Sequence, residues 1–309
     1  MKYPVFLQNN DHIGITALSS GCAEENSVLE MKEALHNLQN YGFTLSLTDD
    51  IFGPEYVSGS IKTRIRQLEK LLEKDIKALL ISRGGNLLYE LLPYLDFSKI
   101  AKKNIWVLGY SDPTSLLYTL TTKYDIATIY GMNAKSFFGT LQEYQKNNLE
   151  LLKGNLVVQK NYDNDLQSIN GNFHDQGIII GGCLDILRHL LGTEYDNTSK
   201  FLEKYKNYHI IWYFDIYSLS SLDVYLTLLQ LKNSGWFKYS KTFLIGKVLF
   251  PNEDAELTYL DAYQKALFGN ILYDTNIGHV KPCFSIINGS LATINYENKN
   301  LSIKQEILK

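Results

Sequence analysis

Short apolar runs alternate with segments of helical spacing along the first half of the chain. The apolar runs, each of a length typical of a buried strand, are 13–18, 43–47, 76–81 and 105–108. Between them, apolar residues recur at helical spacing over 28–41, 61–72, 87–95 and 116–122. Strands that alternate with helices of this length predict βαβ units and a mostly parallel, flavodoxin-like sheet.

The pattern loosens after residue 147, and the stretch 155–172 is polar and broken by Asn, Asp and Gly, as is typical of a domain boundary. In the second half, strand-like and helical segments are predicted at 177–182, 184–191, 210–214, 222–231, 243–248 and 284–296. The fold class expected is therefore α/β with two domains, the second of them mixed and rich in strands. The expected divisions are a first domain at 1–155, a linker at 156–172 and a second domain at 173–309.

The composition of the chain limits its expected partners. Its 309 residues include 30 Lys and Arg against 33 Asp and Glu, a net charge of −3, so no nucleic-acid partner is expected. Neither a signal-peptide pattern nor a run of about 18 apolar residues occurs, so no membrane partner is expected. The three cysteines, at positions 22, 183 and 283, are too few and too widely spaced for a disulfide framework, which favours a reducing, cytoplasmic location.

Two predicted strand ends carry residues suited to chemistry. One is 82–86, with the sequence SRGGN, and the other is 107–115, with the sequence VLGYSDPTS. Ligands of open α/β sheets bind outside the carboxyl ends of the strands, where these two turns are expected to be neighbours. The Gly84-Gly85 pair can turn tightly and offer N–H groups to an oxyanion, and Ser111 can expose a nucleophilic hydroxyl.

Both turns also have a plain structural interpretation. Asp112 suits the N-cap of a helix and Pro113 suits its first helical position, so the second turn reads as a simple helix start. Asn86 suits a cap after the double glycine in the same way. The local residues alone favour this interpretation over a nucleophile.

A serine nucleophile needs a base, usually histidine, and a carboxylate that orients the base. Among the six histidines, His279 stands out because Gly278 and Pro282 shape a loop around it. Asp215 ends a predicted strand and is the candidate carboxylate. A solvated loop histidine and an aspartate that begins a loop are the simpler interpretations of these two residues.

Neither a metal nor a cofactor is expected from the motifs of the chain. No HExxH, CxxC, paired-histidine or phosphate-loop spacing occurs. Nothing beside Cys22 would activate its thiol as a nucleophile, and Cys183 and Cys283 are expected to be small buried residues.

Several blocks, in order along nearly the whole chain, carry a family resemblance. They are IGITALSS, YVSGSIKTRIRQLEKLL, RGGNLLYELLPYLDFSKI, KKNIWVLGYSDPTSLLYTL, IIIGGCLDILRHLLGTEY, IIWYFDIYS and NILYDTNIGHVKPCFSIINGSLA. On these blocks the chain resembles the LD-carboxypeptidases, metal-free serine peptidases that include the microcin C immunity peptidases. The LLPYLDF and GHVKP stretches resemble the microcin-immunity branch more than the murein enzymes.

The resemblance implies a hydrolase with a serine nucleophile, a histidine base and an orienting acid. The implied catalytic residues are Ser111, His279 and Asp215. The implied oxyanion donors are the N–H groups of Gly85 and Asp112, and the implied substrate-binding residues are Gly84 and Arg83. The implied substrate is an amide bond in a murein-type peptide, at an L,D-linkage, or in a peptidyl-nucleotide antibiotic of the microcin C type. A homodimer, an acyl-enzyme and a role in peptidoglycan recycling or microcin immunity are also implied.

The chain departs from the family pattern at three places. Asp215 stands where the family has Glu, which shortens the reach by one C–C bond, about 1.5 Å. Cys183 follows a glycine pair that is usually followed by Asn, and 155–172 lacks the Trp with which the microcin-immunity enzymes stack a nucleotide. An alternative is therefore a catalytically weakened protein that binds a peptide or antibiotic in the same fold. A third reading, a sugar- or nucleotide-binding protein without catalysis, lacks a phosphate motif.

Overall fold

The computed structural model describes residues 1–155 and 158–308 and divides into two compact units, Met1–Leu156 and Val157–Lys309. The start of the predicted linker, 156–157, lies outside the described residues. The rest of that segment supplies two short strands, β6 (Val158–Lys160) and β7 (Gln167–Ser168), to the sheet of the second unit. These residues therefore pair with the sheet of the second unit. Polar residues suit such short outermost strands, one side of which stays unpaired.

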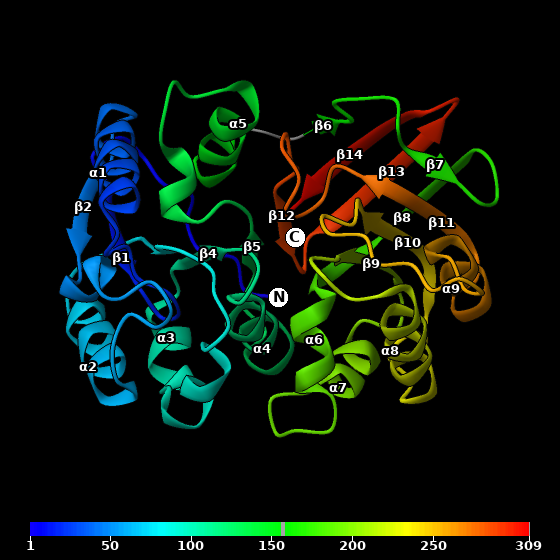
Figure 1. Ribbon diagram of the computed structural model, residues 1–309, viewed down its shortest axis with the longest axis horizontal. Coiled ribbons are helices and arrows are strands. Elements are labelled where there is room, and N and C mark those ends of the chain that lie inside the picture. The colour runs from blue at the N-terminus through cyan, green and yellow to red at the C-terminus, as the bar shows by residue number, and fades with distance from the viewer. Residues whose placement is uncertain (156–157, 309) are drawn as a thin grey trace. The chain divides into compact units, whose positions relative to one another are not determined.

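Five strands of the first unit pair in parallel in one sheet, part of which is labelled in Figure 1. They are β1 (His12–Thr16), β2 (Thr44–Leu47), β3 (Ala78–Ile81), β4 (Trp106–Gly109) and β5 (Thr128–Tyr130). Their order, β2-β1-β3-β4-β5, is that of a flavodoxin-like sheet, and it confirms the predicted class. The order reverses between β1 and β3, so the residues after these two strands meet where such sheets bind ligands.

Three of the four segments predicted to be helical in the first unit, 28–41, 61–72 and 116–122, are helices, whereas the helices at 97–103 and 143–152 were not predicted. The helices of this unit are α1 (Glu25–Asn40), α2 (Ile61–Leu72), α3 (Phe97–Lys103), α4 (Thr114–Tyr124) and α5 (Glu143–Leu152), with 3-10 helices η1 (Asp49–Phe52), η2 (Tyr89–Tyr94) and η3 (Ala134–Phe137). The segment 87–95 was expected to be an ordinary helix, but it forms η2, which contains Pro93. Proline has no N–H to donate inside an α-helix, which explains the short irregular turn.

The second unit is built on a mixed sheet of eight strands (Figure 1). Its other strands are β8 (Phe173–Cys183), β9 (His209–Asp215), β10 (Ser240–Gly246), β11 (Asn270–Thr275), β13 (Leu291–Glu297) and β14 (Asn300–Glu306). The order is β6-β14-β13-β8-β9-β10-β11-β7, in which β8 to β11 run parallel and the outer strands antiparallel. The unit also contains a short strand, β12 (Ile286–Asn288), and the helices α6 (Leu184–Leu190), α7 (Thr198–Lys204), α8 (Ser221–Asn233) and α9 (Tyr259–Ala266). A strand-rich mixed α/β fold is thereby confirmed.

An aromatic core fixes the strand that carries Asp215. Trp212 on β9 is fully buried and stacks on Trp236, with ring centroids 5.5 Å apart. Phe214 stacks on the Trp212 ring, with centroids 5.7 Å apart, and burial of such large rings stabilises the strand that ends at Asp215.

Among the helices of the described residues, none is both long enough and apolar enough to cross a bilayer.

Candidate functional site

Ser111 lies on a sharp turn between a buried strand and a helix. β4 ends at Gly109 and α4 begins at Thr114, so only four residues separate them. Ser111 is half-buried and has a φ of 70°, in the left-handed region that non-glycine residues rarely occupy. A strained residue at a strand-to-helix turn is typical of a nucleophile, because the turn lifts its side chain out of the sheet.

Side chains from β5 and from the residues that follow it hold the turn in this conformation. The Asn133 amide accepts from the N–H of Tyr110 at 3.1 Å and donates to its carbonyl at 3.2 Å. The N–H of Ser111 donates to the Tyr130 hydroxyl at 3.2 Å. A Cβ on Gly109 would lie 2.9 Å from the Asn133 amide oxygen, so the glycine makes room for this clamp. The strain at Ser111 persists because several contacts around it impose the turn.

We expect a glycine at position 111 to be more stable there than an alanine. Glycine adopts a positive φ without the steric cost of about 1–2 kcal/mol that a Cβ carries. Its greater freedom in the unfolded chain offsets about 0.4–1 kcal/mol of this gain. Urea denaturation should therefore give Ser111→Gly a free energy of unfolding about 1 kcal/mol above that of Ser111→Ala. Equal values for the two variants would mean that the turn holds no strain.

The double-glycine turn after β3 lies directly beside Ser111, as the sequence predicts. A Cβ on Gly84 would lie 3.1 Å from Ser111 Cβ and 3.3 Å from its Oγ. Gly85 has a φ of 150°, and a Cβ there would lie 2.4 Å from the hydroxyl oxygens of both Ser19 and Ser20. Glycine is therefore required at position 85, where the backbone lies against Ser19 and Ser20, whereas a side chain at position 84 would crowd Ser111 by a few tenths of an ångström.

Asp112 does not cap α4, which corrects the plain helix-start interpretation. Its carboxylate is buried and accepts hydrogen bonds from the Ser19 hydroxyl and, at 2.8 Å, from the N–H of Leu88. The cap residue of α4 is Pro113, and no side chain caps it. Two donors, each in a charge-assisted bond, thus hold the buried carboxylate away from the first turn of the helix. Asp112 thus ties the serine turn to the chain that follows β1 and β3.

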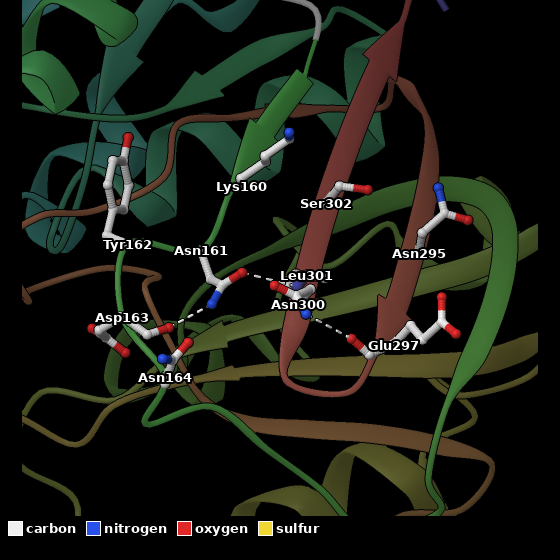
Figure 2. A pocket seen from close by; sticks show the side chains of 10 residues that line it. All are labelled: Lys160, Asn161, Tyr162, Asp163, Asn164, Asn295, Glu297, Asn300, Leu301 and Ser302. Carbon is white, nitrogen blue, oxygen red and sulfur yellow. Dashed lines mark hydrogen bonds between the residues drawn. The ribbon is translucent and has the colours of Figure 1, made fainter.

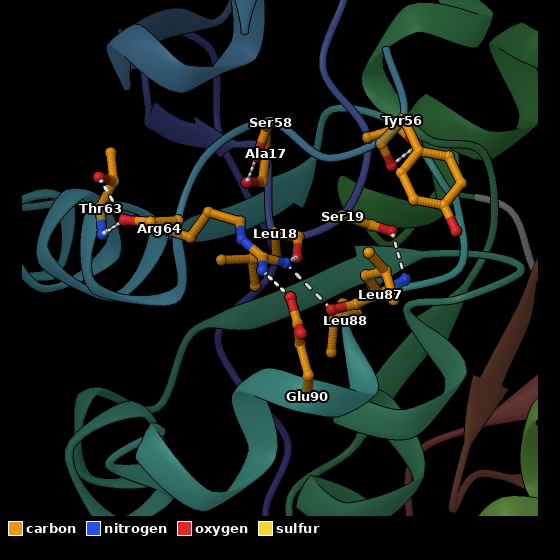
Figure 3. Close-up of polar contacts among 12 residues, drawn as sticks. Ala17, Leu18, Ser19, Tyr56, Ser58, Thr63, Arg64, Leu87, Leu88 and Glu90 are labelled. Atoms are coloured by element: carbon orange, nitrogen blue, oxygen red, sulfur yellow. Dashed lines mark hydrogen bonds and ion pairs between the residues drawn. The ribbon is translucent and has the colours of Figure 1, made fainter. Parts of the chain in front are cut away.

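Arg64 on α2 holds the same region together, and sequence reasoning missed it. Its guanidinium is buried, donates to the carbonyls of Leu18 at 2.9 Å and Leu87 at 3.0 Å, and pairs with Glu90 (Figure 3). The helical spacing could have shown that Arg64 is buried. It lies one helical turn before the buried Leu68, on a helix whose other core positions are leucines. A charge on a core face is normally paired and fixes its neighbours.

Arg83, expected to bind substrate, has protein partners in the structure. Its guanidinium pairs with Glu55 and donates to the carbonyl of Gly21 at 3.0 Å. These contacts join the double-glycine turn to the segment after β1. A role for Arg83 in holding this turn is therefore visible, and binding of substrate stays a prediction.

In the second unit, Asp215 and His279 form a buried acid–imidazole pair. His279 Nδ1 lies 2.7 Å from Asp215 Oδ2, and the N–H of His279 donates to Asp215 Oδ1 at 3.3 Å. The Asp215 side chain is fully buried and the His279 side chain is 10% exposed. The shorter acid therefore reaches the imidazole directly, and one carboxylate fixes both the ring and the backbone of the histidine.

Gly278 allows this close approach. It has a φ of 89°, and a Cβ there would lie 1.9 Å from Asp215 Cγ. No side chain fits between the loop and the acid, so the histidine loop lies directly on the end of β9.

The loop of His279 is anchored by the buried Asn276 and by partly exposed polar groups around it. The Asn276 amide donates to Asp163 at 2.9 Å and accepts from the N–H of Tyr162 at 3.1 Å. Lys247 pairs with Asp163 at 2.7 Å. Such a network fixes the start of the loop, which preorganises the imidazole.

One further residue lies beside the pair. Cys183 ends β8 directly opposite Asp215 in the parallel register and is buried. Burial raises the pKa of its thiol well above the usual range, and the charges of Asp215 and Asp185 add to the effect. The burial of Cys183 that the sequence predicts is confirmed. Its position beside His279 was not predicted, because the two residues are far apart in the sequence.

A separate polar pocket of about 460 Å³ lies in the second unit (Figure 2). Amide and charged side chains dominate its lining, which consists of Lys160, Asn161, Tyr162, Asp163, Asn164, Asn295, Glu297, Asn300, Leu301 and Ser302. Asn161 accepts from the N–H of Leu301 at 2.9 Å and so helps to shape the wall. None of the predicted site residues lines this pocket.

The predicted site residues thus fall into two groups. Ser111, Gly84, Gly85, Asp112 and Arg83 gather around two strand ends of the first unit, and Asp215 and His279 pair in the second. An exposed-turn serine and an imidazole oriented by a buried acid are the parts that define serine hydrolases.

Comparison with known proteins gives the family. The profile of the LD-carboxypeptidase N-terminal domain matches residues 13–131, and that of the LD-carboxypeptidase C-terminal domain matches residues 176–294. The chain therefore belongs to the LD-carboxypeptidase family, which confirms the resemblance drawn from its sequence blocks.

Individual relatives agree over most of the chain. The microcin C7 self-immunity protein MccF of Escherichia coli is 26% identical over 307 residues, covering 88% of this chain and 87% of that protein. A solved structure of MccF in complex with glutamyl sulfamoyl guanosine superposes with a TM-score of 0.82 at 21% identity, covering 99% of both chains. A muramoyltetrapeptide carboxypeptidase from Oxalobacter formigenes gives 0.79 at 20% identity, covering 96% of this chain and 100% of that one. At these identities the two structures establish the shared fold.

Proposed function

We propose that the protein is a metal-free serine carboxypeptidase or amidase that cleaves an amide bond near a carboxylate through an acyl-enzyme on Ser111. The observation that carries the proposal is the strained turn at Ser111 beside the double glycine. Membership of the LD-carboxypeptidase family supports the reaction class.

In the proposed reaction, Ser111 Oγ attacks the amide carbonyl and His279 accepts the hydroxyl proton. Nδ1 of His279 faces Asp215, so Nε2 is the nitrogen that takes this proton. The N–H groups of Gly85 and Asp112 donate to the developing oxyanion. The C–N bond then breaks, and the leaving amine takes the proton from His279. Water attacks the acyl-enzyme with His279 again as base, which releases the acid and restores Ser111.

Two substrate classes follow from the relatives. MccF is named for self-immunity to microcin C7, and a solved structure holds glutamyl sulfamoyl guanosine, an aminoacyl-nucleotide mimic. The Oxalobacter relative is named a muramoyltetrapeptide carboxypeptidase. We therefore propose a murein tetrapeptide or a peptidyl-nucleotide as substrate. The homodimer and the cytoplasmic location expected from the sequence stay predictions.

The test is direct. The purified chain is incubated with a murein tetrapeptide and with a glutamyl-adenylate-type amide, and the products are identified by mass. Release of a terminal amino acid, or of the amine of the nucleotide compound, supports the proposal. Saturable binding of either compound without product, at every enzyme concentration, overturns it in favour of the binding-protein alternative. Cys183 and Asp215, the departures from the family pattern, motivate that alternative.

Exchange of Asp215 for glutamate, the acid usual in the family, is expected to slow hydrolysis here. Gly278 lies so close to Asp215 that a Cβ on it would come within 1.9 Å of Asp215 Cγ, so a longer acid has little room on this side. The carboxylate or the His279 loop must therefore shift by about 1 Å, and a displacement of that size costs up to about 10²-fold in rate. Steady-state kcat/KM of Asp215→Glu should fall about 10- to 100-fold. A rise would mean that the shorter acid limits the enzyme.

A further inference from the structure

Three side chains of different chemistry converge at the carboxyl ends of the parallel strands in the second unit. Cys183 ends β8, Asp215 ends the adjacent β9, and His279 comes from the loop after β11. One ligand atom from each lies within 4.8 Å of the other two. We propose that these residues form a binding site for a soft divalent cation, with Zn²⁺ as the preferred ion, which switches off the histidine.

The donor set selects the ion. A thiolate, an imidazole and a carboxylate are all zinc ligands, and three protein ligands plus a water complete a tetrahedral site. Mg²⁺ and Ca²⁺ prefer oxygen ligands, so a sulfur donor disfavours them. The thiolate and the carboxylate together carry two negative charges, which balance a divalent cation in a buried position.

The geometry is close to that of a bound ion. With bonds of about 2.3 Å to sulfur and about 2.0–2.2 Å to nitrogen and oxygen, ligand atoms around zinc lie roughly 3.3–3.6 Å apart. Since the three ligand atoms lie within 4.8 Å of one another, no separation has to shorten by more than about 1 Å. If Nδ1 is the imidazole ligand, its 2.7 Å distance to Asp215 Oδ2 must lengthen by about 0.6 Å. Small side-chain rotations supply both changes.

Neighbouring groups already orient two of the ligands. Asp215 Oδ1 accepts from the backbone N–H of His279, which leaves Oδ2 to face the imidazole. Asp185 lies 3.7 Å from the Cys183 sulfur and accepts from the N–H groups of Tyr217 and Ser218 at 3.0 Å. Such outer contacts hold metal ligands in place and tune their affinity.

Binding changes the chemistry of the histidine. Zn²⁺ coordinates the thiolate, the imidazole and the carboxylate, and the thiol proton of Cys183 passes to water. When the metal takes Nδ1, the proton that Nδ1 shared with Asp215 moves to Nε2, the other neutral tautomer, so Nε2 carries a proton and cannot act as a base. This consequence rests on the proposed function, whereas the binding itself does not.

The test measures binding without reference to activity. Isothermal titration of the full chain with Zn²⁺ is expected to give one ion per chain, and Mg²⁺ no comparable binding. Co²⁺ should give a thiolate-to-metal charge-transfer band. Cys183→Ala should weaken Zn²⁺ binding at least about 100-fold and abolish the band, since it removes a direct ligand. Cys283→Ala is the matched control and should leave both unchanged.

Several outcomes overturn the inference. Equal Zn²⁺ affinity of the original chain and Cys183→Ala would overturn it, and so would a cobalt band that disappears in Cys283→Ala instead. Thermal unfolding checks that each variant is folded. If Cys183→Ala does not fold, Cys183→Asn, which carries the residue usual in the family, takes its place in both measurements. An active enzyme that binds no zinc contradicts this inference alone. Stoichiometric zinc binding by a chain that cleaves neither substrate contradicts the proposed function alone.

Discussion

Replacement of Ser111 by alanine is expected to reduce hydrolysis by about 10⁴-fold or more, to the level that binding and the oxyanion donors sustain alone. The variant lacks the oxygen that forms the acyl-enzyme. Its stability should hardly change, because alanine keeps the same positive φ and the serine side chain is only half-buried. Single-turnover assays with mass detection measure the first effect and thermal unfolding the second.

Ser115, one helical turn further on, provides the matched control. It is a buried serine of α4 whose hydroxyl donates to the Asp112 carbonyl at 3.1 Å. Ser115→Ala removes a hydroxyl of the same type from the same segment and should keep most of the turnover. If Ser111→Ala hydrolyses substrate as fast as Ser115→Ala, then Ser111 is not the nucleophile.

Replacement of Asp215 by asparagine is expected to lower kcat by about 10³- to 10⁴-fold, by analogy with the same change in another serine protease. The amide carries no charge to stabilise the imidazolium, and its NH₂ group favours the wrong tautomer of His279. Because the acid is fully buried against the ring, water cannot replace its role. Steady-state kinetics across a range of pH values measures the loss.

Asp165→Asn is the control for this change. Asp165 is an exposed carboxylate that pairs with Lys247 at 2.9 Å, so its exchange should leave the rate within about twofold, as is usual for a surface ion pair. A similar small loss in Asp215→Asn would mean that another group orients the histidine.

The sequence predicted four of the five parallel strands of the first unit, because each of these four is a short apolar run closed by glycine or polar residues, and it did not mark the fifth strand at 128–130. It also placed the two glycines beside Ser111 correctly, since the carboxyl ends of adjacent parallel strands share one edge. It failed at 87–95, where leucine spacing suggested an α-helix and Pro93 enforces a 3-10 turn. It did not mark the strand at 300–306, although Leu301 and Ile303 alternate with polar residues there.

The features of the site that sequence reasoning missed depend on tertiary contacts. Asp112 has the local pattern of a helix cap, and only the positions of Ser19 and Leu88 show why its carboxylate turns elsewhere. Arg64 could have been noticed on the core face of its helix, but its partners could not. Cys183 and His279 meet through strand register, which no local spacing encodes.

The contact of Gly278 with Asp215 has a consequence for how this pair can change. In a saturation-mutagenesis library, position 278 should accept glycine alone, because any Cβ collides with the acid and any other residue strains the backbone. A longer acid at 215 works fully only with a loop remodelled to fit it, so each of these changes made alone lowers activity. The acid at 215 and the loop around Gly278 are therefore coupled. A longer acid taken from a relative should support full activity only when the loop of that relative is introduced with it.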